Sequence, residues 1–256
     1  ISECLVGSEM CIRDRSYMTI RMIQNDGIKE SMQIYLEQIT REMDSDYYDM
    51  IGIVNQMSPD GLIGSATERY LSSNDNYDRY LEQKFLREEL IKLGYVNTKL
   101  LGITYYDPKE QKELIGNFNV RVLDPSYQTI SKVVVGADNT IQAMHDSYLG
   151  IKETPVVSVM RRVSFGNQKM LDNYAEMEPD MSVSDQLNKE KWPYTYMEMD
   201  ENGIVQYSNN PVIVQGQKIL SELPKKEGHA VTNQEGYKIM VYRSTTVSYT
   251  HLTLPT

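Results

Sequence analysis

The chain has 256 residues and a formal net charge of −10, with 26 Lys and Arg against 36 Asp and Glu. No stretch is basic enough to follow a phosphate backbone, so the composition argues against a nucleic-acid partner. No run of about 18 apolar residues occurs, which argues against a membrane span within these residues, and the length suits one large domain or two small ones.

Both ends of the chain resemble translated library DNA. Residues 4–15, CLVGSEMCIRDR, and residues 247–256, VSYTHLTLPT, resemble translations of the transposase adapters used in sequencing libraries. We therefore set residues 1–15 and 247–256 aside as adapter-derived. Both cysteines, Cys4 and Cys11, fall in the first of these ends. The natural segment is then expected to hold no disulfide, thiolate metal site or cysteine nucleophile.

The first predicted element is a long helix that starts near Ile28 and ends at the Pro-Asp-Gly sequence of residues 59–61. Apolar residues recur along it every three or four positions, which predicts one buried stripe. They are Met32, Tyr35, Ile39, Met43, Tyr47, Met50, Val54 and Met57. The residues before Ile28 can extend the helix, with Gly27 as a weak point. Such a stripe suits either a bundle helix or a stalk helix laid along a smaller domain.

A second helix is predicted over residues 75–93, with Gly94 as its C-terminal stop. Its inward side chains are expected to be Tyr77, Leu81, Phe85, Leu86 and Leu90.

The pattern then changes from helices to strands. Strands are predicted over residues 100–107, 113–119, 154–165 and 171–178, with a short helix over 138–148 between the two pairs. This order predicts an α+β fold, in which an antiparallel sheet carries helices on one side.

A smaller set of strands follows a polar segment that is expected to hold one short helix. Residues 194–210 form a predicted hairpin, whose Asp-Glu-Asn-Gly turn supplies glycine where a positive φ is needed. A helix-like piece over 212–223 and strands within 227–233 and 235–245 come next. We expect this second sheet to be truncated by the adapter.

These elements together resemble the extracellular double Cache (PAS-like) sensor region of bacterial receptor histidine kinases, especially the Gram-positive group encoded beside sugar-uptake systems. Three stretches carry the resemblance. They are VVSVMRRVSF at 156–165, NYAEMEPDMSVSDQLNK at 173–189 and MDENGIVQYS at 199–208.

The resemblance implies a domain organisation. Residues 16–97 would hold the stalk helix and a second helix, 98–190 the membrane-distal Cache module, and 191–246 an incomplete membrane-proximal module. Transmembrane helices would flank this extracytoplasmic segment, with a kinase domain after the second. A small-molecule ligand (a sugar, organic acid or amino acid) would bind the first module, without a cofactor or metal, and the stalk helix could form a homodimer.

Arg161 is the first candidate ligand-binding residue. In a strand it shares one face with valines 157, 159 and 163, and a lone charge on an apolar face must be paired or hold a ligand. Its planar fork suits a carboxylate or sugar hydroxyls. The alternative is an internal salt bridge to Asp146 or Glu176. The neighbouring Arg162 lies on the opposite face, where a solvated surface charge is expected.

Four more residues are candidates for the same pocket. Tyr105 and Asp107 share a face of the first strand, Tyr148 ends the predicted insert, and Tyr174 follows Arg161 in the next strand. In the family that the chain resembles, the ligand sits between the central strands and such an insert. The alternative is that the tyrosines are packing residues and that Asp107 is a turn residue before Pro108.

No catalytic residues are predicted, because no nucleophile elbow or phosphate-binding glycine loop occurs. We expect a ligand-sensing domain of a two-component histidine kinase, in which the ligand shifts the equilibrium between two arrangements of the stalk. The alternatives are a chemoreceptor, a membrane-bound transcription regulator, and a secreted hydrolase or adhesion module.

Overall fold

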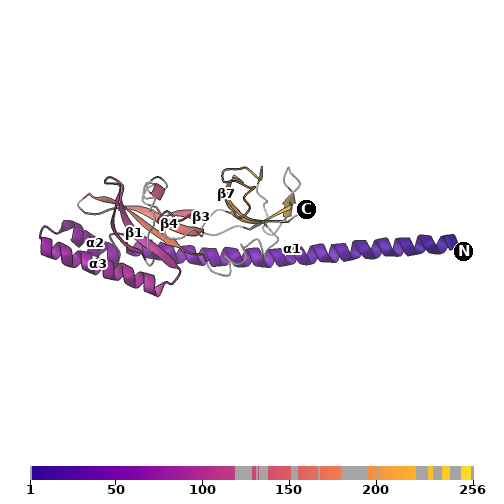
Figure 1. Cartoon of the computed structure of the whole chain (residues 1–256), viewed down its shortest axis with the longest axis horizontal. Coiled ribbons are helices and arrows are strands. Elements are labelled where there is room, and N and C mark those ends of the chain that lie inside the picture. Colours follow the sequence, from indigo (N-terminus) through magenta and orange to yellow (C-terminus); the bar gives the residue numbers. More distant parts are fainter. Residues whose placement is uncertain are drawn as a thin grey trace.

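One helix runs along most of the molecule. The computed structural model describes residues 2–118, 129–130, 132, 138–150, 155–166, 168–179, 195–200, 202–222, 230–232, 238–242 and 249–254. Helix α1 spans Ser2–Gln56 without a break at Gly27. It passes along both sheets and projects beyond them as a rod (Figure 1). The predicted long helix and its upstream extension are confirmed. In the part of the chain that the structure describes, no helix combines the length and apolar character of a membrane span.

The stripe on α1 is buried, although its membership differs from the prediction. Its buried apolar residues are Met32, Leu36, Ile39, Met43, Tyr47, Met50, Ile53, Val54 and Met57, so Leu36 and Ile53 are added and Tyr35 is absent. Tyr35 was expected inward, but its exposed fraction is 39%, close to the 38% of Ile28 near the expected start of the helix. Leu36, four residues after Met32, takes the place of Tyr35 because it lies on the side that faces the sheets. A single continuous apolar side of α1 therefore supports the rest of the fold.

The chain reverses sharply after α1 and enters a short helix that the sequence did not predict. Pro59 cannot continue the helix and disfavours helical backbone at the residue before it. Helix α2, Leu62–Ser72, starts at once. A Cβ atom at Gly61 would lie 2.2 Å from the carbonyl oxygen of Gln56, and one at Gly64 would lie 1.8 Å from that of Ser58. The two glycines thus let α2 pack directly against the end of α1.

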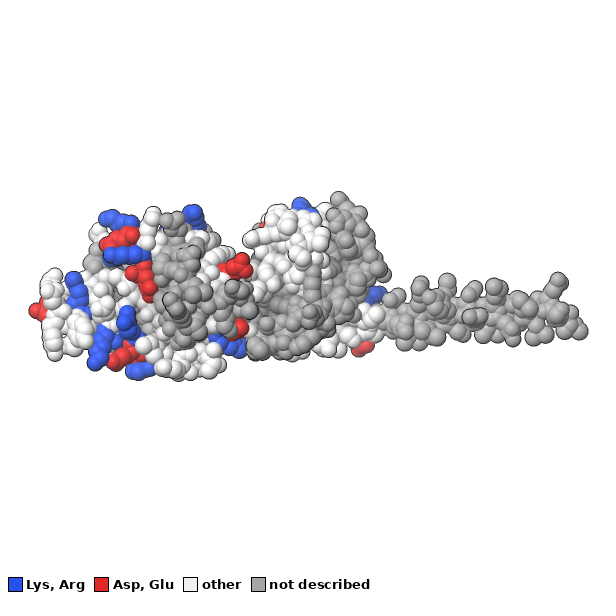
Figure 2. All heavy atoms as spheres, in the orientation of Figure 1, with Lys and Arg blue, Asp and Glu red and all other residues white. Residues whose placement is uncertain are grey.

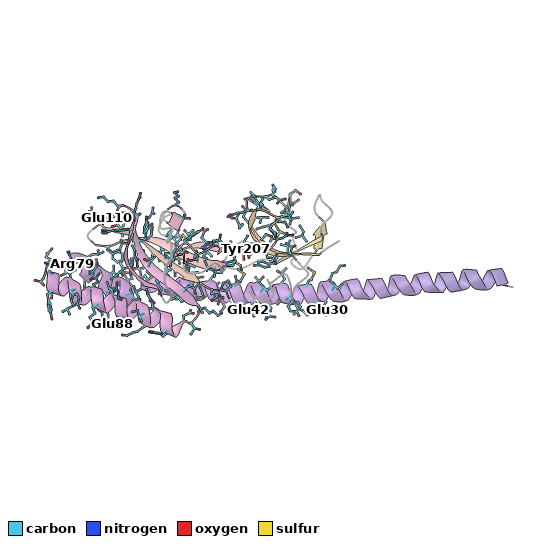
Figure 3. All side chains as sticks on the ribbon, viewed as in Figure 1. Glu30, Glu42, Arg79, Glu88, Glu110 and Tyr207 are labelled. Carbon is cyan, nitrogen blue, oxygen red and sulfur yellow. The ribbon has the colours of Figure 1, made fainter. Side chains whose placement is uncertain are left out.

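Helix α3, Asn76–Val96, confirms the second predicted helix and is capped by Asp75, whose side chain accepts from the backbone N–H groups of residues 77 and 78. Leu86 and Leu90 are buried as predicted, where Asn117 of the sheet donates to the Leu90 carbonyl oxygen at 2.8 Å. The first half of the predicted inward face is wrong, because Tyr77, Leu81 and Phe85 are exposed. Figure 3 places Arg79, in this half, beyond the edge of the sheet, where the sheet cannot cover it. Gly94 does not end the helix, which continues to Val96.

The first sheet has five antiparallel strands in the order β2-β1-β5-β4-β3. Their bounds are β1 Leu100–Asp107, β2 Lys112–Phe118, β3 Thr140–His145, β4 Val156–Ser164 and β5 Met170–Met177. The four predicted strands are confirmed. The helix predicted over 138–148 is wrong, since β3 forms there and pairs Thr140 with Met160 and Ile141 with Val159. Pairing with the edge of β4, helped by two β-branched residues at the start of β3, outweighs local helix propensity.

The second sheet also has five strands, in the order β7-β6-β10-β9-β8. Their bounds are β6 Thr195–Met199, β7 Val205–Ser208, β8 Ala230–Thr232, β9 Lys238–Tyr242 and β10 Tyr249–Leu254. The predicted hairpin is confirmed as β6 and β7, with Gly203 at a φ of +74°. The helix-like piece is wrong over residues 212–222, where the chain makes turns and an isolated bridge between Ile204 and Lys218. The short helix expected within 179–191 lies almost wholly outside the described residues.

Strand β10 lies within the end that the sequence reading assigned to an adapter. It is central in the second sheet, where it pairs with β6 on one side and β9 on the other. We expected the adapter to truncate the second sheet, and residues 249–254 nevertheless supply its central strand. The origin of residues 247–256 stays a prediction. Both sheets lie along α1, so the architecture is α+β with two antiparallel sheets on one stalk helix, as predicted (Figure 1).

Candidate functional site

The two faces of the first sheet have different roles. Odd-numbered residues of β4, such as Val157, Val159 and Val163, belong to the core that contains the α1 stripe. Even-numbered residues, such as Val156 and Met160, belong to a separate cluster with Leu101, Ile130, Leu149 and Tyr174. We call these the stalk face and the outer face.

Arg161 lies on the stalk face, as the alternation predicts. Its Nη1 donates to the Oδ1 of Asn55 in α1 at 3.1 Å. Glu176, one of its expected salt-bridge partners, points to the outer face and accepts hydrogen bonds there from Ser147 and Tyr174. Arg161 therefore joins β4 to the last turn of the stalk helix.

Tyr105 and Asp107 do not reach the outer face either. The hydroxyl of Tyr105 donates to the Met57 carbonyl oxygen at 2.6 Å, at the end of α1. Asp107 accepts from the backbone N–H groups of residues 109 and 110, as its alternative role in a turn predicts, and pairs with Lys169 at 2.6 Å. Burial favours a higher pKa for Asp107, but these hydrogen bonds and the lysine outweigh it and hold the pKa below its usual value.

Tyr148 and Tyr174 are the two predicted site residues that the structure brings together, with ring centroids 6.2 Å apart. Tyr148 is partly exposed and stacks on His145, at 4.1 Å and with 16° between the ring planes. Tyr174 is fully buried below it, and its hydroxyl donates to Glu176 Oε2 at 2.8 Å. We call the group of His145, Ser147, Tyr148, Ser158, Tyr174 and Glu176 the Tyr148 cluster.

The hydrogen bonds of His145 fix its protonation in this cluster. Nδ1 lies 2.6 Å from the carbonyl oxygen of Asp146, which can only accept, so Nδ1 carries the proton. Nε2 lies 2.7 Å from Ser158 Oγ and accepts from that hydroxyl when the ring is neutral. Burial lowers the pKa of His145, which favours this neutral form. The imidazole is thus a fixed, uncharged platform for the Tyr148 ring.

Glu176 anchors the turn that carries Tyr148. It is fully buried and accepts from Ser147 Oγ as well as from Tyr174. Burial raises the pKa of Glu176, and these hydroxyls together with the backbone N–H groups of Tyr148 and Leu149 oppose the shift. Because its donors come from the protein itself, Glu176 positions the aromatic pair rather than serving as a free acceptor for a ligand.

An ion pair that the sequence reading missed continues the outer face. Arg162 donates from Nε and a terminal nitrogen to the two carboxylate oxygens of Asp172, at 2.6 and 2.9 Å. Asp172 is fully buried, and its carboxylate raises the pKa of Arg162. The expectation of a solvated surface charge at Arg162 is therefore wrong.

The register of the β4–β5 hairpin arranges these groups in a row. It sets Arg162 opposite Asp172, Met160 opposite Tyr174, and Ser158 opposite Glu176. Successive pairs lie about 7 Å apart along the strands. Along the outer face, the Arg162–Asp172 ion pair is thus followed by Met160 beside Tyr174 and then by the hydrogen bonds of Glu176. The stacked rings of Tyr148 and His145 lie next to this row. Most of the segment between β2 and β3 lies outside the described residues.

A groove lies beside the stalk, away from the outer face. The open groove of about 520 Å³ runs between α1, the end of α3 and the loop into β1, and Tyr48, Asp49, Gly52, Asn97 and Lys99 are among its lining residues. Lys99 is engaged there with the buried Asp46 at 2.7 Å. On the view of Figure 2, acidic and basic side chains are interspersed over the first module. No group of three potential metal ligands occurs among the described residues.

Comparison with solved structures identifies the fold. The sensor domain of the histidine kinase DctB from V. cholerae has a TM-score of 0.54 at 11% identity, covering 91% of this chain and 99% of that chain. The ligand-binding domain of the Pseudomonas aeruginosa PAO1 amino-acid chemoreceptor PctC, in complex with GABA, has a TM-score of 0.52 at 9% identity, covering 89% and 99%. The fold is that of a Cache-like sensor domain. No protein-family model and no curated protein sequence matches the chain.

Proposed function

We propose that this Cache-like chain is the extracytoplasmic sensor region of a membrane receptor of the two-component histidine kinase class. It would bind a small molecule on the outer face of the first sheet. Binding would shift the equilibrium between two arrangements of the stalk helix α1. The observation that carries the proposal is the Tyr148 cluster, in which a partly exposed tyrosine is stacked and held by a buried network. Aromatic faces with nearby polar groups are typical of small-ligand sites.

The ligand classes proposed are a sugar, an organic acid or an amino acid, without a cofactor. A thermal-shift screen of the 256-residue chain with these compounds tests binding, because a ligand that binds only the native state raises Tm. The Tyr148→Ala variant should lose any shift that is found while still unfolding in one cooperative transition. A screen without any shift, or an undiminished shift in Tyr148→Ala, would reject the outer-face site.

Arg161→Ala is the matched comparison on the stalk face of the same sheet. If the ligand binds beside Tyr148, the shift survives in Arg161→Ala, since this side chain reaches toward Asn55 of the stalk helix. If Arg161 holds the ligand, as the sequence alone suggested, the shift is lost in Arg161→Ala and retained in Tyr148→Ala. The two variants therefore separate the two proposed sites.

The output domain and the membrane segments are proposed from the resemblance and the fold. Similarity to both a kinase sensor and a chemoreceptor domain supports either receptor class. Reading the source locus past residues 16 and 246 tests this, together with the adapter origin of both ends. Apolar segments of about 20 residues on both sides, followed by a kinase domain, would support a histidine kinase. A signal peptide with no second apolar segment would refute the receptor.

We also propose a homodimer through the stalk helix. Ile34 and Tyr48 on α1 have exposed fractions of 59% and 58%, so apolar surface on the stalk remains uncovered in one chain. Analytical ultracentrifugation of the chain should show a concentration-dependent dimer that Ile34→Glu weakens. A monomer at all concentrations would contradict it for the isolated sensor region.

A further inference from the structure

The edge strand β3 leaves its ladder at a bulge that faces the second sheet. Its register with β4 shifts between Gln142 and His145. A bulge leaves backbone groups outside the ladder, and those groups need other partners when they are buried. Here the hydroxyl of Tyr47 in α1 donates to the Gln142 carbonyl oxygen at 2.8 Å, and the Met144 N–H donates to Glu198 Oε2 at 2.9 Å. The stalk helix and β6 thus both hold the bulge.

Glu198 joins three elements through one carboxylate. Its exposed fraction is 2%, and its other oxygen, Oε1, accepts from the Tyr196 hydroxyl at 2.8 Å. The same hydroxyl lies 3.1 Å from Met43 Sδ on the stalk helix. Figure 3 shows Tyr207, which packs near Tyr196, at the junction of the two sheets. The carboxylate of Glu198 therefore lies where β3, β6 and α1 meet.

A buried carboxylate at this junction has an energetic cost that only its hydrogen bonds offset. The titratable groups around it are the phenols of Tyr47, Tyr196 and Tyr207, whose pKa values burial and the carboxylate raise. Burial likewise raises the pKa of Glu198, which the Met144 N–H and the Tyr196 hydroxyl oppose. An apolar side chain would pack here without this cost, so a glutamate indicates a requirement for the contact with the bulge.

We propose that Glu198 is the positioning residue that couples the first sheet to the second. It holds Met144, and the next residue, His145, carries the stacked Tyr148 ring. A displacement at the Tyr148 cluster would therefore move the bulge, and Glu198 would pass the movement to Tyr196 and the stalk helix. The origin of that displacement in ligand binding rests on the proposed function, but the mechanical link itself does not.

Hydrogen exchange of the 256-residue chain, followed by mass spectrometry at single-amide resolution, tests the link without a ligand. In Glu198→Leu the Met144 amide loses its acceptor, and we expect it to exchange roughly tenfold faster, together with the amides of β6. Glu198→Gln should restore slow exchange at Met144, because its amide oxygen can still accept that bond. Unchanged exchange at Met144 and β6 in Glu198→Leu would overturn the proposal.

Asp107→Leu is the control, since Asp107 is also a buried carboxylate but its partners Lys109, Glu110 and Lys169 lie in the first module, outside the Tyr148 cluster. Its effect should be confined to the turn at residues 107–110 and leave β6 unchanged. An equal effect on β6 would show general loosening and overturn the specific role of Glu198. Tyr196→Phe is the substitute if Glu198→Leu fails to fold. It keeps the aromatic ring but removes the hydroxyl that donates to Glu198 Oε1. We expect it to accelerate amide exchange in both β3 and β6. Failure to do so would also overturn the coupling.

A double-mutant cycle then tests transmission across the bridge. Tyr148→Ala should change exchange in β6 when Glu198 is present and should have no further effect there in the Glu198→Leu background. The same change in both backgrounds would mean that the signal bypasses Glu198. Because these measurements use no ligand, an unsuccessful ligand screen leaves the coupling result intact, and a failed coupling leaves ligand binding to be judged separately.

Discussion

The ion pair between Arg162 and Asp172 gives the sharpest stability prediction. Replacing Arg162 by leucine removes two charge-assisted hydrogen bonds, of 2.6 and 2.9 Å, from a carboxylate that is fully buried. Removing one partner of a buried pair costs about 3–5 kcal/mol, because the remaining charge has no compensation. The side chain of Arg162 is 27% exposed, so water reaches one end of the pair. We therefore expect a loss near the lower limit, about 3 kcal/mol.

Replacing both partners should have the opposite outcome. In the variant with leucine at 162 and at 172 no buried charge remains, and substitutions of this kind are often neutral or stabilising. The assay is urea unfolding followed by circular dichroism, with the free energy of unfolding extrapolated to water. The coupling energy follows from the four free energies of wild type, the two single variants and the double variant.

Two results would refute this reasoning. A loss below about 0.5 kcal/mol in Arg162→Leu would mean that solvent screens the pair as it does surface salt bridges. A double variant as unstable as the sum of the single variants would show that the two side chains do not depend on each other. If Arg162→Leu is instead stable but loses a ligand-induced thermal shift, then Arg162 belongs to the binding surface.

Three further predictions concern other parts of the fold. Tyr105→Phe removes the hydrogen bond to the Met57 carbonyl oxygen and should lower the free energy of unfolding by about 1 kcal/mol in urea titrations, without changing ligand binding. Gly203→Ala should cost about 1–2 kcal/mol or more in the same assay, because φ is +74° and the new Cβ would lie 2.5 Å from the Leu220 carbonyl oxygen. Burial raises the folded-state pKa of Glu198 above its ordinary 4.5. Its contribution to the free energy of unfolding is therefore complete below pH 4.5 and is lost as the pH rises through the raised pKa. The stability of wild type relative to Glu198→Gln should therefore fall with rising pH, by at most about 1.4 kcal/mol per unit, and a rise would contradict the shift.

Hydrophobic period and turn residues predicted most of the fold because they report local geometry. The α1 stripe, the bounds of β1 and the glycine turn before β7 all follow from spacing within one element. The predicted burial of the first half of α3 is wrong because it depends on where the sheet ends. The helix predicted in place of β3 is wrong because pairing with β4 sets the conformation of this segment, and local propensity does not include that partner.

The candidate site was harder to predict because the sequence does not say which face of a strand meets the helix. Alternation placed Arg161 and Arg162 on opposite faces of β4, but burial beside three valines made Arg161 look like the ligand residue. In fact the valines face the stalk, and the outer face carries Arg162. The Gly-Asn-Gln-Lys sequence at 166–169, between the two predicted strands, is typical of a turn and already contained a useful signal. Pairing the strands about that turn sets residue 162 opposite 172 and residue 158 opposite 176.

The separation of the two faces also constrains how a signal could travel. A ligand at the Tyr148 cluster would lie on the far side of the first sheet from α1, and the sheet between them is a layer of paired strands. Such a layer resists bending at its centre, where β5 is paired on both sides, more than at an edge strand with a bulge. β3 is that edge, and its bulge is held by Tyr47 of the stalk and by Glu198 of the second sheet. The compliant edge of the first sheet is therefore also the place where the first sheet is joined to the second.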